Sequence, residues 1–254
     1  MAGGLIERLY SSLRGSQRAQ FDRPLDAATV ADSFAATVHD LQGANARGPF
    51  YPTGTRTPLG DLQAARVHST DSVVDTEHLQ ALMGAPTRWR VDGAEDLDFV
   101  YLCRELTPMS SLGRGRREWL VEDSDRRISL DALLMNALDR TPIVAEIKVG
   151  NDENAELALV QALAAAAQLS TLAQRKRLGS EFRDYLGLEV PMRLDVYVIT
   201  ARVPDTGIRP QLAERAHRLA DELDRSGALG EWVRKIRFLE ATVQAGQMRH
   251  RLVH

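Results

Sequence analysis

Two hydrophobic segments carry acidic side chains and a lysine at spacings that could bind a metal ion. Asp131 lies within Arg127–Met135 (RISLDALLM), and Glu146 and Lys148 lie within Pro142–Val149 (PIVAEIKV). Both segments have the composition of β-strands. Because successive side chains of a strand point to opposite faces, Glu146 and Lys148 share one face. The sequence therefore predicts a charged pair on an otherwise hydrophobic strand.

The turn between these segments decides which residues face one another. We expect a turn at Asn136–Thr141, centred between Leu138 and Asp139. This register places Asp131 directly opposite Glu146. Opposed side chains in a hairpin lie about 4.5–5.5 Å apart at Cβ. Two carboxylates at that separation can chelate one divalent ion, since hard cations take oxygen ligands.

Together these groups could hydrolyse a phosphodiester bond. A cation such as Mg²⁺ or Mn²⁺ would neutralise the two acids and keep several waters for chemistry. The charge of Lys148 would favour a hydroxide nucleophile or stabilise the pentacovalent state. The alternative is a solvated strand face on which Glu146 and Lys148 form an ordinary surface ion pair.

This pattern resembles the PD-(D/E)xK nuclease superfamily, which includes restriction endonucleases and recombination-linked exonucleases. The resemblance covers about residues 115–203 and adds a fourth residue, Gln161, on the helix that follows the lysine. It implies that Asp131 and Glu146 bind Mg²⁺ or Mn²⁺. It also implies that Lys148 assists the attacking water and that Gln161 supports the site.

The sequence departs from the superfamily pattern at several positions. Leu130 stands where many members have a proline before the aspartate. Related nucleases often carry a tyrosine four residues after the glutamine, and here Ala165 follows Gln161 at that distance. Many members add an upstream glutamate to the metal ligands. Glu77 and Glu105 are both candidates, and the sequence does not choose between them.

The elements that must position these residues form an ordered series after residue 110. The expected strands are Glu118–Glu122, Arg127–Met135, Pro142–Val149, Arg193–Val203 and Lys235–Val243, and the expected helices run from an Asp152 N-cap to about Arg177 and from Pro210 to Gly227. A right-handed crossover through the first helix would make the strands on either side of it parallel. We therefore predict an α/β fold, a mixed β-sheet sandwiched by helices. The resemblance implies a restriction-endonuclease-like β-β-β-α-β core.

The chain before residue 110 has a different character. It predicts an amphipathic helix around Leu5–Leu13, a helix from Asp26 to Gly43, a loop at 44–63, a short helix starting at Asp75 and a strand at Phe99–Leu102. We therefore predict two domains, a mainly helical region at 1–110 and a nuclease-like domain at 111–254. The first could complete the fold, form a homodimer or line the substrate site, and the sequence leaves these alternatives open.

Binding of a phosphate backbone would need a local basic patch. Lys and Arg total 32 against 35 Asp and Glu, for a formal charge of −3, so the whole molecule does not attract polyanions. Arg114, Arg116 and Arg117 follow two serines and alternate with glycines in SSLGRGRR. Arginines can bind phosphate with two hydrogen bonds each. The alternative is a flexible, arginine-rich loop between two halves of the chain.

The rest of the sequence excludes other classes. It has no HExxH, Walker or GxGxxG motif, and no stretch approaches the roughly 20 apolar residues of a membrane span. A single cysteine, Cys103, favours a reducing compartment and predicts a cytoplasmic protein. The sequence thus predicts a Mg²⁺-dependent deoxyribonuclease that acts on DNA. The alternative is an inactive nuclease-like module that binds DNA or a protein partner.

Overall fold

The computed structural model describes residues 6, 9–10, 13, 24–44, 51–52, 88–107, 130–149, 154–187, 193–201, 210–244 and 247–254. The strand expected at Glu118–Glu122 and the short helix expected from Asp75 lie outside the described residues.

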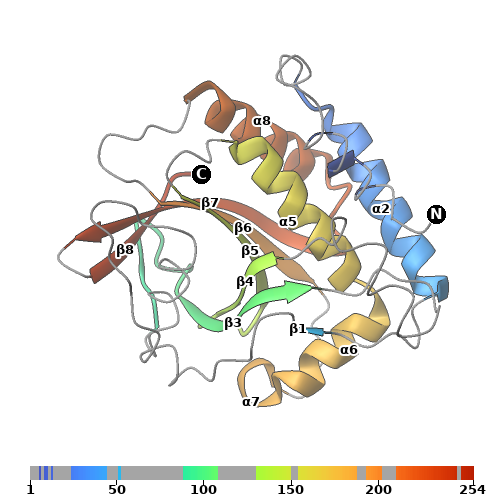
Figure 1. The fold of residues 1–254 in the computed structure, drawn as a ribbon, viewed down its shortest axis with the longest axis horizontal. Coiled ribbons are helices and arrows are strands. Elements are labelled where there is room, and N and C mark those ends of the chain that lie inside the picture. The colour runs from blue at the N-terminus through green and yellow to red at the C-terminus, as the bar shows by residue number, and fades with distance from the viewer. Residues whose placement is uncertain are drawn as a thin grey trace, which may run out of the picture.

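The described strands form one eight-stranded sheet in the order β1-β3-β4-β5-β6-β7-β8-β2 (Figure 1). They are β1 Tyr51–Pro52, β2 Val91–Asp92, β3 Phe99–Thr107, β4 Leu130–Asn136, β5 Pro142–Val149, β6 Leu194–Ala201, β7 Val233–Gln244 and β8 Gln247–Leu252. The neighbours β5, β6 and β7 are parallel, and β2 is parallel to β8, whereas the other pairs are antiparallel. The protein therefore has an α/β fold with a mixed sheet.

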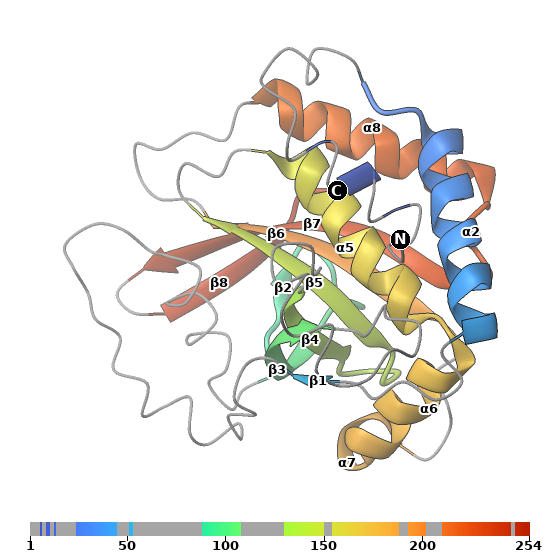
Figure 2. The same cartoon turned by 45° about the vertical axis from the view of Figure 1, so that its right-hand side comes forward.

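Helices pack on one face of this sheet. The described helices are α2 Ala27–Ala44, α5 Ala155–Leu169, α6 Leu172–Glu181, α7 Arg183–Leu186 and α8 Pro210–Ser226. Figures 1 and 2 show α2, α5 and α8 stacked over the central strands, and one core cluster joins them to the sheet. In the described part of the chain, the second core cluster contains no helical residue. The expected sandwich with helices on both faces is thus not seen there, because the curled sheet and the segment between β2 and β3 cover the second face.

The predicted hairpin is confirmed. Strand β5 has the expected bounds, and β4 pairs with it in the expected register, with Ala132 opposite Ala145 and Leu134 opposite Ile143. The Asn136 amide donates to the Thr141 carbonyl at 2.8 Å and closes the turn. One further step along this register brings Asp131 opposite Glu146.

The long helix expected from Asp152 to Arg177 is wrong in two respects. Asn154, rather than Asp152, caps α5, because its side chain accepts the Leu157 amide at 2.9 Å. The helix also ends at Leu169. The Ser170 hydroxyl donates to the Ala166 carbonyl at 2.7 Å, and Thr171 is extended and caps the new helix α6. Hydroxyl side chains that bond to the nearby backbone compete with helix continuation in this way.

Other predicted elements are confirmed. Asp26 caps α2 by accepting the Thr29 amide at 2.8 Å. Helix α8 runs from Pro210 to Ser226 and stops at Gly227, whose φ of 66° favours glycine. Strand β6 is parallel to β5, as the right-handed crossover predicts.

The chain before residue 110 contributes strands as well as a helix. Strands β1, β2 and β3 belong to the same sheet as the later strands, and β3 pairs directly with β4. The domain boundary expected at residue 110 therefore falls within one continuous sheet. Among the described residues, no helix is long and apolar enough to cross a bilayer.

A buried histidine at the sheet edge should make stability depend on pH. His250 is 1% exposed, no described residue forms a hydrogen bond with its ring nitrogens, and it packs edge-on against Trp89 and Phe99. Burial lowers the pKa of His250 to about 4 from the usual 6.5. As pH falls, the unfolded chain takes up this proton first, so stability is kept above pH 6.5 and lost as pH falls toward 4.

Replacing this histidine tests the pH effect. Between pH 8 and pH 5, the wild type should lose about 2 kcal/mol of unfolding free energy through His250. His250→Phe should lack this loss, because the ring no longer titrates. Urea unfolding at both pH values measures it, with exposed His39→Gln as the control. Equal pH dependence in wild type and His250→Phe would contradict the prediction.

Candidate active site

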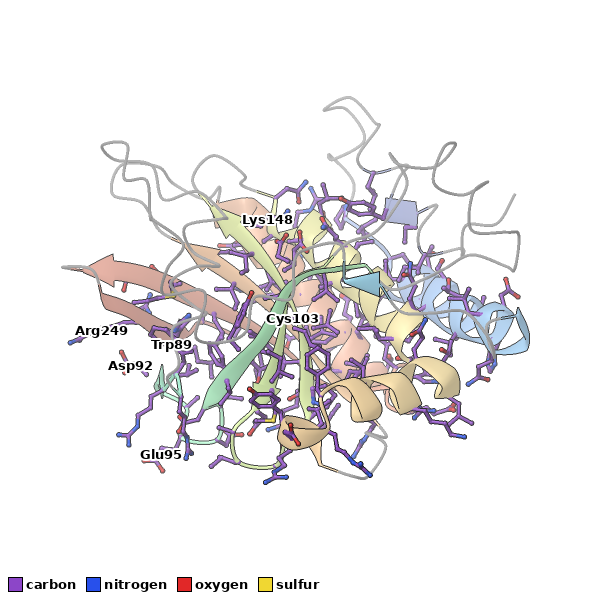
Figure 3. The ribbon with its side chains drawn as sticks, turned by 60° about the horizontal axis from the view of Figure 1, so that its bottom comes forward. Trp89, Asp92, Glu95, Cys103, Lys148 and Arg249 are labelled. Atoms are coloured by element: carbon purple, nitrogen blue, oxygen red, sulfur yellow. The ribbon has the colours of Figure 1, made fainter. Side chains whose placement is uncertain are left out.

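The three residues expected to do chemistry lie on the helix-covered face of the sheet. Val144 of β5 belongs to the core cluster that includes α5. Glu146 and Lys148 follow at two-residue steps and so share its face. Asp131, at the start of β4, continues the hairpin register on the same face. Figure 3 shows Lys148 near the carboxyl end of β5.

Direct contacts bring these side chains together. The Lys148 Nζ lies 3.0 Å from Oε1 of Glu146. Asp131 Oδ2 accepts the backbone amide of Ile147 at 2.8 Å, so it bonds to β5 between the other two residues. Glu146 is 1% exposed, whereas the Lys148 side chain is 11% exposed and Asp131 is partly exposed. The site is thus buried on the side of the glutamate and open on the side of the aspartate and the lysine.

The electrostatics of the site favour a bound cation. Burial raises the pKa of the Glu146 carboxyl well above its usual value, and the charge of Asp131 raises it further, while the Lys148 ammonium opposes both. Glu146 Oε2 is buried, and no donor among the described residues is in hydrogen-bonding position to it. An unsatisfied carboxylate oxygen beside a second acid is costly without a positive charge. The two acids supply the hard oxygen donors that Mg²⁺ and Mn²⁺ prefer.

This arrangement predicts that Glu146 destabilises the metal-free protein. Because its pKa is raised in the folded state, the stability that it contributes at low pH is lost as pH rises through the folded pKa. Glu146→Gln removes the buried charge and should stabilise the metal-free protein by about 1–3 kcal/mol at pH 8 and by less at pH 5. Urea unfolding in EDTA measures the difference.

A matched control is Glu231→Gln, because Glu231 is exposed. It should change the unfolding free energy by less than about 0.5 kcal/mol. A Glu146→Gln protein that is less stable than wild type at pH 8 would contradict this prediction. It would show that other groups of the protein already offset the cost of burying the Glu146 charge.

Register identifies one of the two upstream acids as a neighbour of the site. Strand β3 pairs with β4 so that Arg104 faces Ala132 and Leu106 faces Leu130. Glu105 therefore takes the register position opposite Asp131. Glu77 lies outside the described residues, as do the predicted phosphate-binding residues Arg114, Arg116 and Arg117.

Gln161 lies on α5 on the flank that faces away from α8. Glu156, in the first turn of α5, pairs with Arg215 of α8 at 2.9 Å. Gln161 is five residues later, a rotation of about 140° around the helix. Helix α8 packs against β7, and β4 lies on the other side of β5 from β7.

The sequence does not predict one polar contact of Gln161. The Tyr10 hydroxyl donates to Gln161 Oε1 at 2.9 Å. Tyr10 was expected only as an apolar position of an N-terminal helix, and no local pattern connects residues that are 151 positions apart.

No protein-family model, curated protein or solved structure matches this chain. The case for a function therefore rests on the residues and contacts above.

Proposed function

We propose that this protein is a metal-dependent nuclease of the PD-(D/E)xK type that hydrolyses phosphodiester bonds in DNA. The observation that carries the proposal is the meeting of Asp131, Glu146 and Lys148 on one face of a hairpin, with the glutamate buried and no described donor bonded to its Oε2.

The order of elements supports the proposal. In the described part of the chain, strands β3, β4 and β5 come before helix α5 and strand β6. This order is compatible with the β-β-β-α-β core that the resemblance implies, with β3 in the place of the strand expected at Glu118–Glu122. Glu146 and Lys148 lie in the carboxyl half of β5, which is parallel to β6. Ligands of open α/β sheets bind outside the carboxyl ends of such strands.

Asp131 and Glu146 are the residues that would hold Mg²⁺ or Mn²⁺. Glu105 is the third acid of the proposal, because its register position is opposite Asp131. A bound divalent ion would supply Lewis-acid polarisation of the phosphate and a more acidic water.

The chain's own residues would complete the chemistry. Glu146 holds the Lys148 ammonium in place at 3.0 Å. That fixed positive charge would stabilise the negative charge that builds up on the phosphate oxygens, with little reorganisation during the reaction. Gln161 of α5, the fourth residue that the resemblance implies, would support the site.

The test combines cation binding with cleavage. Calorimetric titration with MnCl₂ should show binding that Asp131→Asn abolishes and Glu105→Gln weakens, whereas Glu231→Gln, at an exposed position, leaves it unchanged. Supercoiled plasmid should be nicked or degraded with MgCl₂ and remain intact with EDTA. Binding that survives Asp131→Asn would contradict the assigned ligands, and intact plasmid under all metal conditions would contradict nuclease activity on this DNA.

One observation favours the second candidate, an inactive nuclease-like module. Within the part of the chain that the structure describes, no group of three or more His, Cys, Asp or Glu could hold a metal ion. An inactive module would bind DNA in a gel-shift assay without cleaving it. In calorimetry it would show no manganese binding that depends on the Asp131 and Glu146 carboxylates.

A further inference from the structure

We propose that His217 and His254 form a pH-sensitive latch that holds the segment after β8 against helix α8 at neutral pH and releases it in mild acid. The two histidines lie outside the candidate active site, and the inference does not depend on the proposed nuclease function.

The latch is a stack of two imidazole rings. The ring of His217, on α8, lies almost parallel to that of His254, with 4.7 Å between the centroids and 2° between the planes. Phe238 of β7 is 3% exposed and packs edge-on against both rings, at 4.6 Å from His217 and 5.9 Å from His254. His254 Nε2 also lies 3.1 Å from Oδ1 of Asp221, one turn after His217 on α8. The His254 side chain therefore contacts a helix and a strand at once.

Backbone bonds hold the same segment on β7. Beyond the end of β8 at Leu252, the Val253 amide donates to the Phe238 carbonyl at 2.8 Å. The Phe238 amide donates to the His254 carbonyl at 2.7 Å. The Val253 side chain is 47% exposed, so it anchors the segment little. The His254 ring thus links this segment to α8, and release of the segment would open the Phe238 amide to exchange with solvent.

Protonation works against the stack. Two protonated rings would place like charges on planes whose centroids are 4.7 Å apart. Burial lowers the pKa of His217, and charge on His254 lowers it further, while Asp221 and Glu214 of α8 oppose both effects. Because the folded pKa of His217 lies below its usual 6.5, the stability that the closed stack contributes is present above pH 6.5 and is lost as pH falls.

Another acid of α8 acts on the stack, and its charge also declines in acid. Burial raises the pKa of the Asp224 carboxyl, and Asp221 adds to this rise, while Arg237 of β7 and charge on His254 oppose it. Asp224 therefore loses its negative charge at a higher pH than an exposed aspartate does. In mild acid it offsets less of the positive charge on the rings.

Hydrogen exchange of the Val253 and Phe238 amides tests the latch on the full chain. After correction for the intrinsic exchange rate, their protection in the wild type should fall about 5-fold between pH 7.5 and pH 5.5, because the segment opens locally. His217→Phe keeps an aromatic ring against His254 but cannot take up a proton, so its protection should fall less than about 2-fold. Both proteins retain His250, so the titration of that buried histidine cancels in the comparison.

A second variant and a control complete the test. Asp221→Asn removes an acid that opposes the repulsion between protonated rings, so the fall in protection should be larger than in the wild type. His39→Gln, at an exposed position of α2, should behave as the wild type. Equal falls in the wild type and His217→Phe would overturn the latch, and so would a fall in Asp221→Asn that is no larger than that of the wild type.

Discussion

Lys148→Ala should lower the kcat of Mg²⁺-dependent DNA cleavage about 100- to 1,000-fold, the effect of removing one preorganised charge from a transition state. Lys148 is the cation nearest the two acids that the described contacts show, 3.0 Å from Glu146. Asp131→Asn should abolish cleavage, because it removes a carboxylate from the proposed metal ligands while an amide of similar shape keeps an acceptor for the Ile147 amide. A plasmid-nicking assay with purified protein measures both effects.

The chain offers a matched control. Lys148, Lys176 and Lys235 are its three lysines. Lys176→Ala, at an exposed position of α6, should cleave within about 2-fold of wild type, as surface substitutions usually do. Circular dichroism of each variant shows whether it is folded. A folded Lys148→Ala protein that cleaves at the wild-type rate would remove the lysine from the mechanism.

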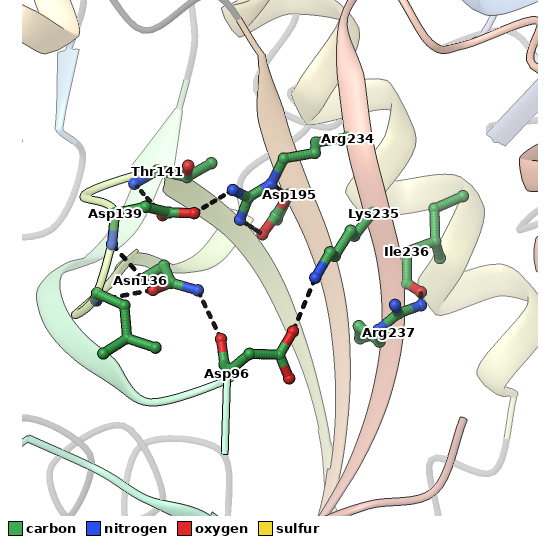
Figure 4. A network of polar contacts seen from close by, with 10 residues as sticks. Asp96, Asn136, Asp139, Thr141, Asp195, Arg234, Lys235, Ile236 and Arg237 are labelled. Atoms are coloured by element: carbon green, nitrogen blue, oxygen red, sulfur yellow. Dashed lines mark hydrogen bonds and ion pairs between the residues drawn. The ribbon is translucent and has the colours of Figure 1, made fainter. Parts of the chain in front are cut away.

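Arg234→Ala should reduce the unfolding free energy by about 3–5 kcal/mol, the cost of leaving a buried charge without its partner. The Arg234 guanidinium binds both oxygens of Asp195, with Nε 2.9 Å from Oδ1 and Nη2 2.6 Å from Oδ2. It also pairs with Asp139 in the β4–β5 turn (Figure 4). Asp195 is fully buried, so Arg234→Ala removes its charged partner at a poorly solvated position.

The size of this loss should depend on pH. Burial raises the pKa of Asp195, while the hydrogen bonds and charge of Arg234 lower it. Without Arg234 the pKa rises further, and stability is then lost as pH rises through the folded pKa. Urea unfolding should therefore show a larger deficit at pH 8 than at pH 5. A deficit that is the same at both pH values would contradict the electrostatic explanation.

Two further variants separate the buried pair from a surface pair. Adding Asp195→Asn to Arg234→Ala removes the uncompensated charge and should restore much of the lost stability. Lys235→Ala breaks a pair with the exposed Asp96 and should cost less than about 1 kcal/mol, as exposed ion pairs contribute little.

The hairpin and its three polar residues could be predicted because the information is local. The hydrophobic run of β5, the turn and the alternation of side chains together set the register that places Asp131 opposite Glu146.

No strand is predicted at β8, although buried and exposed side chains alternate along it in the structure. Met248 and His250 are buried, and Arg249 and Arg251 are exposed. The polar composition of Gln247–Leu252 hides this period.

Other features depend on contacts that no local pattern contains. The end of α5 is decided by hydroxyl-to-backbone bonds at Ser170 and Thr171, two residues that an apolar helix pattern does not distinguish from ordinary helix positions. The contact between Tyr10 and Gln161 and the register position of Glu105 both depend on how distant segments pack. Long-range pairing of this kind is set by the whole fold, so the sequence could name the candidates but not choose among them.

Polar groups are found at both ends of the parallel strands, with a network of ion pairs at their amino ends and the candidate catalytic groups toward their carboxyl ends. Asp195 is the register partner of Ile143, five residues before Lys148 on β5, which at strand rise is about 16 Å. Substitutions that far apart usually combine independently. On the proposed nuclease function, an engineer could therefore strengthen the amino-end network in a Lys148 variant and obtain a robust, non-cleaving protein for capturing intact DNA.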